Sequence, residues 1–84
     1  MAVQPIVMYG TIWCPDCTRS KRLLEKKGVQ YTWCDIEKDP LARDYVIKVN
    51  HGKRSVPTIV FPDGSILVEP SDAELGKKLG PNSG

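Results

Sequence analysis

The chain has 84 residues, 40% of them hydrophobic, and a formal net charge of +2. This length allows one compact domain with a small core and leaves no room for a second domain. The charge is too small to indicate a nucleic-acid partner, and no apolar run approaches the ~20 residues that would cross a membrane.

The cysteines indicate the cellular compartment. Cys14, Cys17 and Cys34 cannot all pair within the chain. No secretory segment precedes them, because Gln4 and Pro5 interrupt the apolar start of the chain. We therefore expect a cytoplasmic protein, and in that reducing compartment a Cys-x-x-Cys pair is usually catalytic or metal-binding rather than structural.

The first half of the chain predicts two βα units. Residues 5–9 are an apolar run rich in strand formers, and a helix follows from Pro15 until Gly28 supplies a left-handed end. Residues 29–36 return to strand character and should lie parallel to the first strand. A second helix follows residues 39–40, Asp-Pro, which are a cap and a first-turn proline.

The second half predicts an antiparallel hairpin and a short terminal helix. Residues 57–61 and 65–68 are apolar segments on either side of a Pro-Asp-Gly turn. Ser71 and Glu74 have the spacing of a capping box. We therefore predict an α/β domain over residues 1–80, with a four-stranded mixed sheet flanked by three helices in the order β-α-β-α-β-β-α. Residues 81–84 are expected to be a disordered tail or a remnant of expression.

The segment Cys14-Pro15-Asp16-Cys17 lies between the first predicted strand and the first predicted helix. The helix would direct N–H groups and a partial positive charge at the first sulfur, which favours a reactive thiolate. We expect Cys14 to be exposed at the helix N-cap and to act as the nucleophile. Cys17, one turn inside and partly covered, is suited to resolve a mixed disulfide.

Asp16 is a less expected residue beside a reactive thiol. Its carboxylate should disfavour the thiolate of Cys14 by like-charge repulsion, although a carboxylate near a helix start is itself favourable. Arg19, Lys21 and Arg22 can offset part of that repulsion, and the helix geometry allows only some of them to turn toward the sulfur.

A structural alternative for the cysteine pair is half of a zinc site. Zinc needs four ligands, and the remaining candidates, Cys34 and His51, lie on separate predicted elements without the paired spacing of structural zinc sites. We therefore expect no metal site and favour redox chemistry, with Cys34 a small buried side chain of the second strand.

Residues 9–17, Tyr-Gly-Thr-Ile-Trp-Cys-Pro-Asp-Cys, resemble the active-site segment of glutaredoxins, and residues 55–58, Ser-Val-Pro-Thr, resemble the Thr-Val-Pro motif of that family. The order of elements matches as well, over residues 3–79. Residues 50–54, Asn-His-Gly-Lys-Arg, resemble most the mycoredoxin-like actinobacterial branch. The resemblance implies a thioredoxin fold with a cis peptide bond before Pro57.

The resemblance also implies which residues bind substrate. The backbone N–H and C=O of Val56 would face outward and pair with an extended thiol substrate. Ser71 and Asp72 are explained equally well as a helix cap. The candidate substrate-binding residues are Trp13, Asp16, Arg54, Val56, Pro57, Ser71 and Asp72.

Two departures from the family concern the identity of the small thiol. Glutaredoxins usually carry a Lys shortly before the Trp-Cys segment and a Gly-Gly pair before the last helix. This chain has Thr11-Ile12 and Val68-Glu69-Pro70 at those places. Both differences remove features associated with binding glutathione, so mycothiol or a protein substrate is an alternative.

We therefore expect a monomeric thiol-disulfide oxidoreductase that reduces protein mixed disulfides with mycothiol or glutathione as co-substrate, without a tightly bound cofactor. One alternative is a dithiol electron donor to ribonucleotide reductase, recharged by thioredoxin reductase. An alternative of another class is a metal or iron-sulfur carrier that uses Cys14 in a dimer. Cys17 and Pro15 argue against that class, because a second nearby thiol offers a disulfide as the competing outcome.

Overall fold

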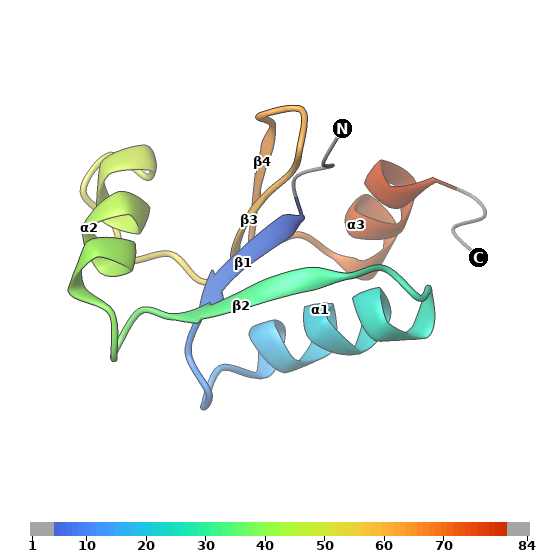
Figure 1. Cartoon of the computed structure of the whole chain (residues 1–84), viewed down its shortest axis with the longest axis horizontal. Helices are drawn as coiled ribbons and strands as arrows, with labels where there is room; N and C mark the ends of the chain where they lie inside the picture. Colours follow the sequence, from blue (N-terminus) through green and yellow to red (C-terminus); the bar gives the residue numbers. More distant parts are fainter. Residues whose placement is uncertain (1–4, 81–84) are drawn as a thin grey trace.

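The computed structural model describes residues 5–80 and has the predicted order of elements (Figure 1). A central sheet has helices on both faces. The elements are β1 (Ile6–Gly10), α1 (Pro15–Lys26), β2 (Tyr31–Asp35), α2 (Pro40–Val49), β3 (Thr58–Val60), β4 (Ile66–Val68) and α3 (Asp72–Leu79). Within the described residues, no helix is long and apolar enough to cross a membrane.

The sheet has four strands in the order β2-β1-β3-β4. β1 is parallel to β2, with Met8 opposite Trp33, and antiparallel to β3, with Met8 also opposite Ile59. β3 and β4 form the predicted antiparallel hairpin. The mixed sheet is therefore confirmed, and β1 lies at its centre because both of its edges are paired.

Two hydrophobic clusters hold the helices on the sheet. On one face, α1 and α3 pack on β1 and β3 around a core of Ile6, Met8, Leu24, Ile59, Phe61 and Leu75. On the other face, α2 packs through Ala42 and Val46 against Ile36, beside Tyr9 of β1. Figure 1 shows this division, with α2 apart from α1 and α3. Burial of these apolar side chains is the main stabilising contribution to the domain.

The strands are shorter than the sequence pattern predicts. Val29 was expected in the second strand, but its N–H donates to the carbonyl of Leu24 at 3.0 Å and so completes the end of α1. Phe61 was expected in the third strand and lies in the turn instead, where its N–H donates to the carbonyl of Ser65. The tail predicted for residues 81–84 lies outside the described residues.

The helix caps agree with the sequence. The Asp39 side chain accepts hydrogen bonds from the first-turn N–H groups of α2, and Ser71 with Glu74 forms the complete capping box of α3. At α1, Cys14 is the N-cap residue and Pro15 is the first helical residue. Pro15 is well placed there because the N–H that proline lacks would have no partner within the helix.

A buried threonine connects α2 with the loop before β3. Thr58 is fully buried, and its hydroxyl donates to the carbonyl of Ser55 at 2.8 Å. It also accepts a hydrogen bond from the Asn50 side chain at 3.0 Å, and the same amide donates to the carbonyl of Val46. This network fixes the loop of residues 55–57 against the end of α2.

We expect Thr58→Val to lower the free energy of unfolding by about 1–3 kcal/mol, because the substitution leaves buried polar partners unsatisfied. Urea denaturation measures this change. Thr32→Val is the matched control, since Thr32 is exposed on β2. Equal stability of the two variants would show that the network contributes nothing.

Candidate active site

Cys14 lies in the loop between β1 and α1, at the N-cap of the helix. Its N–H donates to the carbonyl of Thr11 at 3.4 Å, and its sulfur lies 3.9 Å from the carbonyl oxygen of Val56. The expectation of an exposed Cys14 is wrong, because the residue is 8% exposed. The Val56 loop, distant in sequence, covers much of the cysteine, so a reacting sulfur has a narrow approach.

Cys17 lies one helical turn further on and is 1% exposed. Burial raises the pKa of its thiol to about 12, although a hydrogen bond from the backbone of Thr11 acts in the opposite direction. The Cys14 thiol also interacts with Cys17 and contributes to the raised pKa. Both thiols are free in this structure. The sequence predicted this arrangement of an outer and an inner thiol.

Gly10, the last residue of β1, permits the burial of Cys17. A Cβ atom at Gly10 would lie 2.5 Å from the Cys17 sulfur and 2.9 Å from the Trp33 ring. Real Cβ atoms do not approach other atoms so closely, so any side chain at this position would displace the sulfur or the ring. The glycine therefore allows α1 to begin directly against the end of β1.

The Val56–Pro57 peptide bond is cis, as the resemblance implied. Pro57 is buried, and the Val56 carbonyl faces the Cys14 sulfur. In the part of the chain that the structure describes, the Val56 N–H has no hydrogen-bond partner. A free N–H beside a thiol is a group with which an extended substrate can pair.

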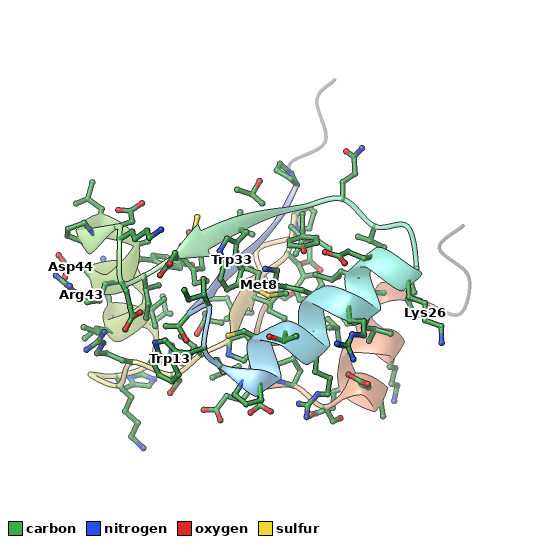
Figure 2. The ribbon with its side chains drawn as sticks, turned by 90° about the horizontal axis from the view of Figure 1, so that it is seen from below. Met8, Trp13, Lys26, Trp33, Arg43 and Asp44 are labelled. Carbon is green, nitrogen blue, oxygen red and sulfur yellow. The ribbon has the colours of Figure 1, made fainter. Side chains whose placement is uncertain are left out.

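A groove of about 270 Å³ runs beside Cys14 and is lined by Thr11, Trp13, Ile36, Glu37, Arg54 and Val56. Trp13 is 66% exposed, and its indole N–H donates to the Glu37 carboxylate at 3.0 Å. Figure 2 shows Trp13 on the α2 side of the start of α1. The groove brings together three of the predicted substrate-binding residues, Trp13, Arg54 and Val56.

Three other predicted binding residues lie away from the lining of this groove. Asp16 pairs with Arg19 at 3.3 Å, and Arg19 also lies 3.5 Å from Asp72. Arg19 further donates to the carbonyl of Pro70 at 3.3 Å. The arginine thus links the first turn of α1 to the start of α3, where the Ser71 side chain caps the helix.

The other basic candidates near Asp16 have different contacts or positions. Lys21 lies over the Trp33 ring, with its nitrogen 4.2 Å from the ring centroid. Arg22 is exposed on α1. Arg19 is therefore the residue that offsets the Asp16 charge.

Sequence reasoning missed three groove residues, Thr11, Ile36 and Glu37. A usable signal existed, because β1 and β2 were predicted to be parallel and the carboxyl ends of parallel strands meet at one edge of a sheet. The segment after β2 should therefore lie beside the segment after β1. Residues 36–37 do lie there, against the loop that precedes Cys14.

Cys34 was expected to be buried in β2 and is only partly buried. The reason is that β2 is an edge strand, so its side chains have less cover than those of β1. Cys34 packs against the Ile36, Ala42 and Val46 cluster. Within residues 5–80, no three His, Cys, Asp or Glu side chains are grouped so that they could hold a metal ion.

A cysteine pair at the turn of a parallel βα unit, facing a cis-proline loop, is characteristic of the thioredoxin-fold class of thiol proteins. Comparison with solved structures supports this assignment of the fold. A glutaredoxin from Archaeoglobus fulgidus matches with a TM-score of 0.72 and 26% identity, covering 89% of this chain and 85% of that one. A wheat glutaredoxin has the same fold, with a TM-score of 0.70 and 21% identity over 94% of this chain and 76% of its own.

Sequence comparison defines the family within this class. The glutaredoxin family model matches residues 6–66. A protein of Mycobacterium tuberculosis assigned to the glutaredoxins is 40% identical over 79 residues, which cover 94% of each chain. Mycoredoxin 1 of Corynebacterium glutamicum is 35% identical over 74 residues, covering 88% of this chain and 91% of its own. The chain belongs to the glutaredoxin family and is a thiol-disulfide oxidoreductase.

The raised pKa of Cys17 predicts an unusual pH profile of alkylation. In the Cys14→Ser variant, the iodoacetamide reaction of Cys17, followed by peptide mass mapping, should rise about tenfold per pH unit between about pH 8 and 10. A buried thiol with a pKa of about 12 is still almost fully protonated there. The same variant in urea is the control and should level off from about pH 9. A plateau near that pH in the folded protein would contradict the raised pKa.

Proposed function

We propose that this chain reduces mixed disulfides between proteins and a low-molecular-weight thiol, with Cys14 as the nucleophile and either a second small thiol or Cys17 as the resolving thiol. The observation that carries the proposal is the position of the Cys14 sulfur, at the start of α1 and 3.9 Å from the carbonyl oxygen of Val56, a residue that lines the groove. The start of a helix stabilises negative charge, so it supports a reacting thiolate.

The reaction consists of two thiol exchanges. The Cys14 thiolate attacks the small-thiol sulfur of the mixed disulfide, a Cys14–small thiol disulfide forms, and the protein leaves as a thiolate that takes up a proton. A second small thiol, as its thiolate, then attacks the adduct, releases Cys14 and forms the small-thiol disulfide. The free small thiol supplies the reducing equivalent for the protein sulfur, the small-thiol sulfur of the mixed disulfide stays at the disulfide level, and the enzyme returns to its starting state.

The lining of the groove supports this assignment of roles. The unpaired N–H of Val56 and its carbonyl can pair with the backbone of a bound thiol. The exposed Trp13 ring provides an apolar wall next to the nucleophile. Pro57 lacks an N–H, so it places no further donor in this loop.

Mycothiol is the small thiol that we propose, with glutathione as the alternative. The resemblance to mycoredoxin 1 supports this choice. So does the replacement of the Lys and Gly-Gly features of glutaredoxins by Thr11-Ile12 and Val68-Glu69-Pro70. At the start of α3, the Ser71 hydroxyl serves as a cap and Asp72 pairs with Arg19, so both groups already have partners. The proposal places the protein in the reducing cytoplasm, as a monomer.

A second candidate function is dithiol electron transfer to a protein such as ribonucleotide reductase, with thioredoxin reductase as the electron source. The contact between the Cys14 and Cys17 thiols favours it, because an intramolecular disulfide can form without a second small thiol. The burial of Cys17 and its raised pKa make the second thiol a slow nucleophile, so we rank this function below the first.

Serine variants separate the two functions. We expect Cys14→Ser to abolish reduction of a mycothiol–peptide mixed disulfide, whereas Cys17→Ser should retain most of the activity because a second small thiol can resolve the adduct. A coupled assay measures both activities, with NADPH and, in turn, mycothiol with a mycothiol disulfide reductase, glutathione with a glutathione disulfide reductase, or thioredoxin reductase alone. Cys34→Ser is the matched control, since Cys34 lies outside the groove lining.

The outcomes discriminate between the proposals. Full activity of Cys14→Ser would show that Cys14 is not the nucleophile. Loss of all activity in Cys17→Ser, with turnover supported by thioredoxin reductase alone, would favour the dithiol function. No reductase activity of the wild-type chain with any of the three reductants would exclude both.

A further inference from the structure

Glu37 is an exposed, charged residue of the groove lining, with one hydrogen bond at its backbone and one at its carboxylate. Its N–H donates to the Asp35 carboxylate at 2.9 Å, and its own Oε1 accepts the indole N–H of Trp13 at 3.0 Å. Among the residues that the structure describes, Oε2 has no partner. The groove next to the nucleophile therefore contains a positioned carboxylate with one oxygen free to accept a hydrogen bond.

Thr11 is a second polar group in the same groove without a partner. The residue is 3% exposed, and no group within residues 5–80 forms a hydrogen bond with its Oγ1. Burying a hydroxyl without a hydrogen bond is unfavourable, so a ligand group that reached Oγ1 from the groove would supply the partner that this hydroxyl lacks. A threonine hydroxyl can both donate to and accept from that ligand.

Arg54 lines the groove and carries the opposite charge. It is exposed, and in the described part of the chain it makes no hydrogen bond or ion pair. A long unrestrained side chain loses conformational entropy when it binds an anion, whereas Glu37 is already ordered by its contacts. The fixed charge in the groove is therefore negative.

We propose that Glu37 and Thr11 select the small thiol. They favour an uncharged, hydroxyl-bearing group in the groove and disfavour a thiol that places a carboxylate there. This inference rests on the thiol-exchange function proposed above and names the residues that set its specificity. An ionised carboxylate accepts hydrogen bonds from hydroxyl groups and repels a second carboxylate. The face of the Trp13 indole adds an apolar surface on which a ring of the bound thiol can pack.

The test compares three disulfides of one peptide: with glutathione, with the dimethyl ester of glutathione, and with mycothiol. The ester removes the carboxylates and leaves the rest of the glutathione skeleton unchanged. We expect kcat/KM of the wild-type protein to be about three- to tenfold higher for the ester than for glutathione, and the difference to shrink at high salt.

Two variants and a control assign the effect to the proposed residues. Glu37→Gln keeps an oxygen that can accept the Trp13 N–H and removes the charge, so the ratio of ester to glutathione should fall to about one. Thr11→Val should lower kcat/KM for mycothiol and leave glutathione nearly unchanged. Glu25→Gln removes a carboxylate outside the groove, one that accepts from the Tyr31 hydroxyl at 2.7 Å, and should leave the ratio unchanged.

Three results would overturn the inference. A slower reaction of the ester in the wild-type protein would show that Arg54 attracts carboxylates more strongly than Glu37 repels them. An unchanged ratio in Glu37→Gln would show that Glu37 has no part in selection. An equal decrease of the rates with all three disulfides in Thr11→Val would show that Thr11 has a structural role and does not select the thiol. Failure of the proposed function looks different, because the wild-type protein would then turn over none of the three disulfides.

Discussion

The contact between Gly10 and Cys17 is the constraint on which the site depends. A side chain at Gly10 would overlap the Cys17 sulfur and the Trp33 ring. Its absence lets the first turn of α1 lie against the end of β1, which buries Cys17 and leaves Cys14 at the helix start. The two cysteines have the same covalent chemistry, and their separate environments arise from this one close approach. Burial then gives Cys17 its raised pKa, so the inner thiol stays protonated at neutral pH.

Chain topology completes the site around this contact. Because β1 and β2 are parallel, the loop with Trp13 and the segment with Glu37 leave the sheet at the same edge and meet there. β3 runs antiparallel to β1, so β3 begins at that edge of the sheet. Val56, which lies shortly before β3 in the chain, is therefore at the same edge. The Thr58 network fixes the Val56 loop to α2. Three segments distant in sequence, which follow β1, follow β2 and precede β3, thus form one groove beside Cys14.

The sequence predicted the order of elements, the sheet and the N-cap position of Cys14, because these follow from local patterns such as apolar runs, Pro15 and the Ser71 cap. It did not predict the burial of Cys14, since a cover formed by Val56 depends on a contact between residues 42 positions apart. It also missed Glu37, whose role depends on the Trp13 hydrogen bond rather than on any motif. Side-chain partners across loops arise from packing, and no periodicity encodes them.

The carboxylates near Cys14 differ in whether a basic side chain forms an ion pair with them. Arg19 pairs with both Asp16 and Asp72, so these two carboxylates share one positive charge. On the groove side, the Glu37 carboxylate accepts a hydrogen bond from the neutral Trp13 indole, and Arg54, which lines the same groove, forms no ion pair with it. A thiol that approaches Cys14 therefore meets carboxylates paired with an arginine on one side, and on the other side a carboxylate that has no ion pair among the described residues. Selection by charge can operate only where the charge is not already paired, so the groove side is where this site can distinguish one small thiol from another.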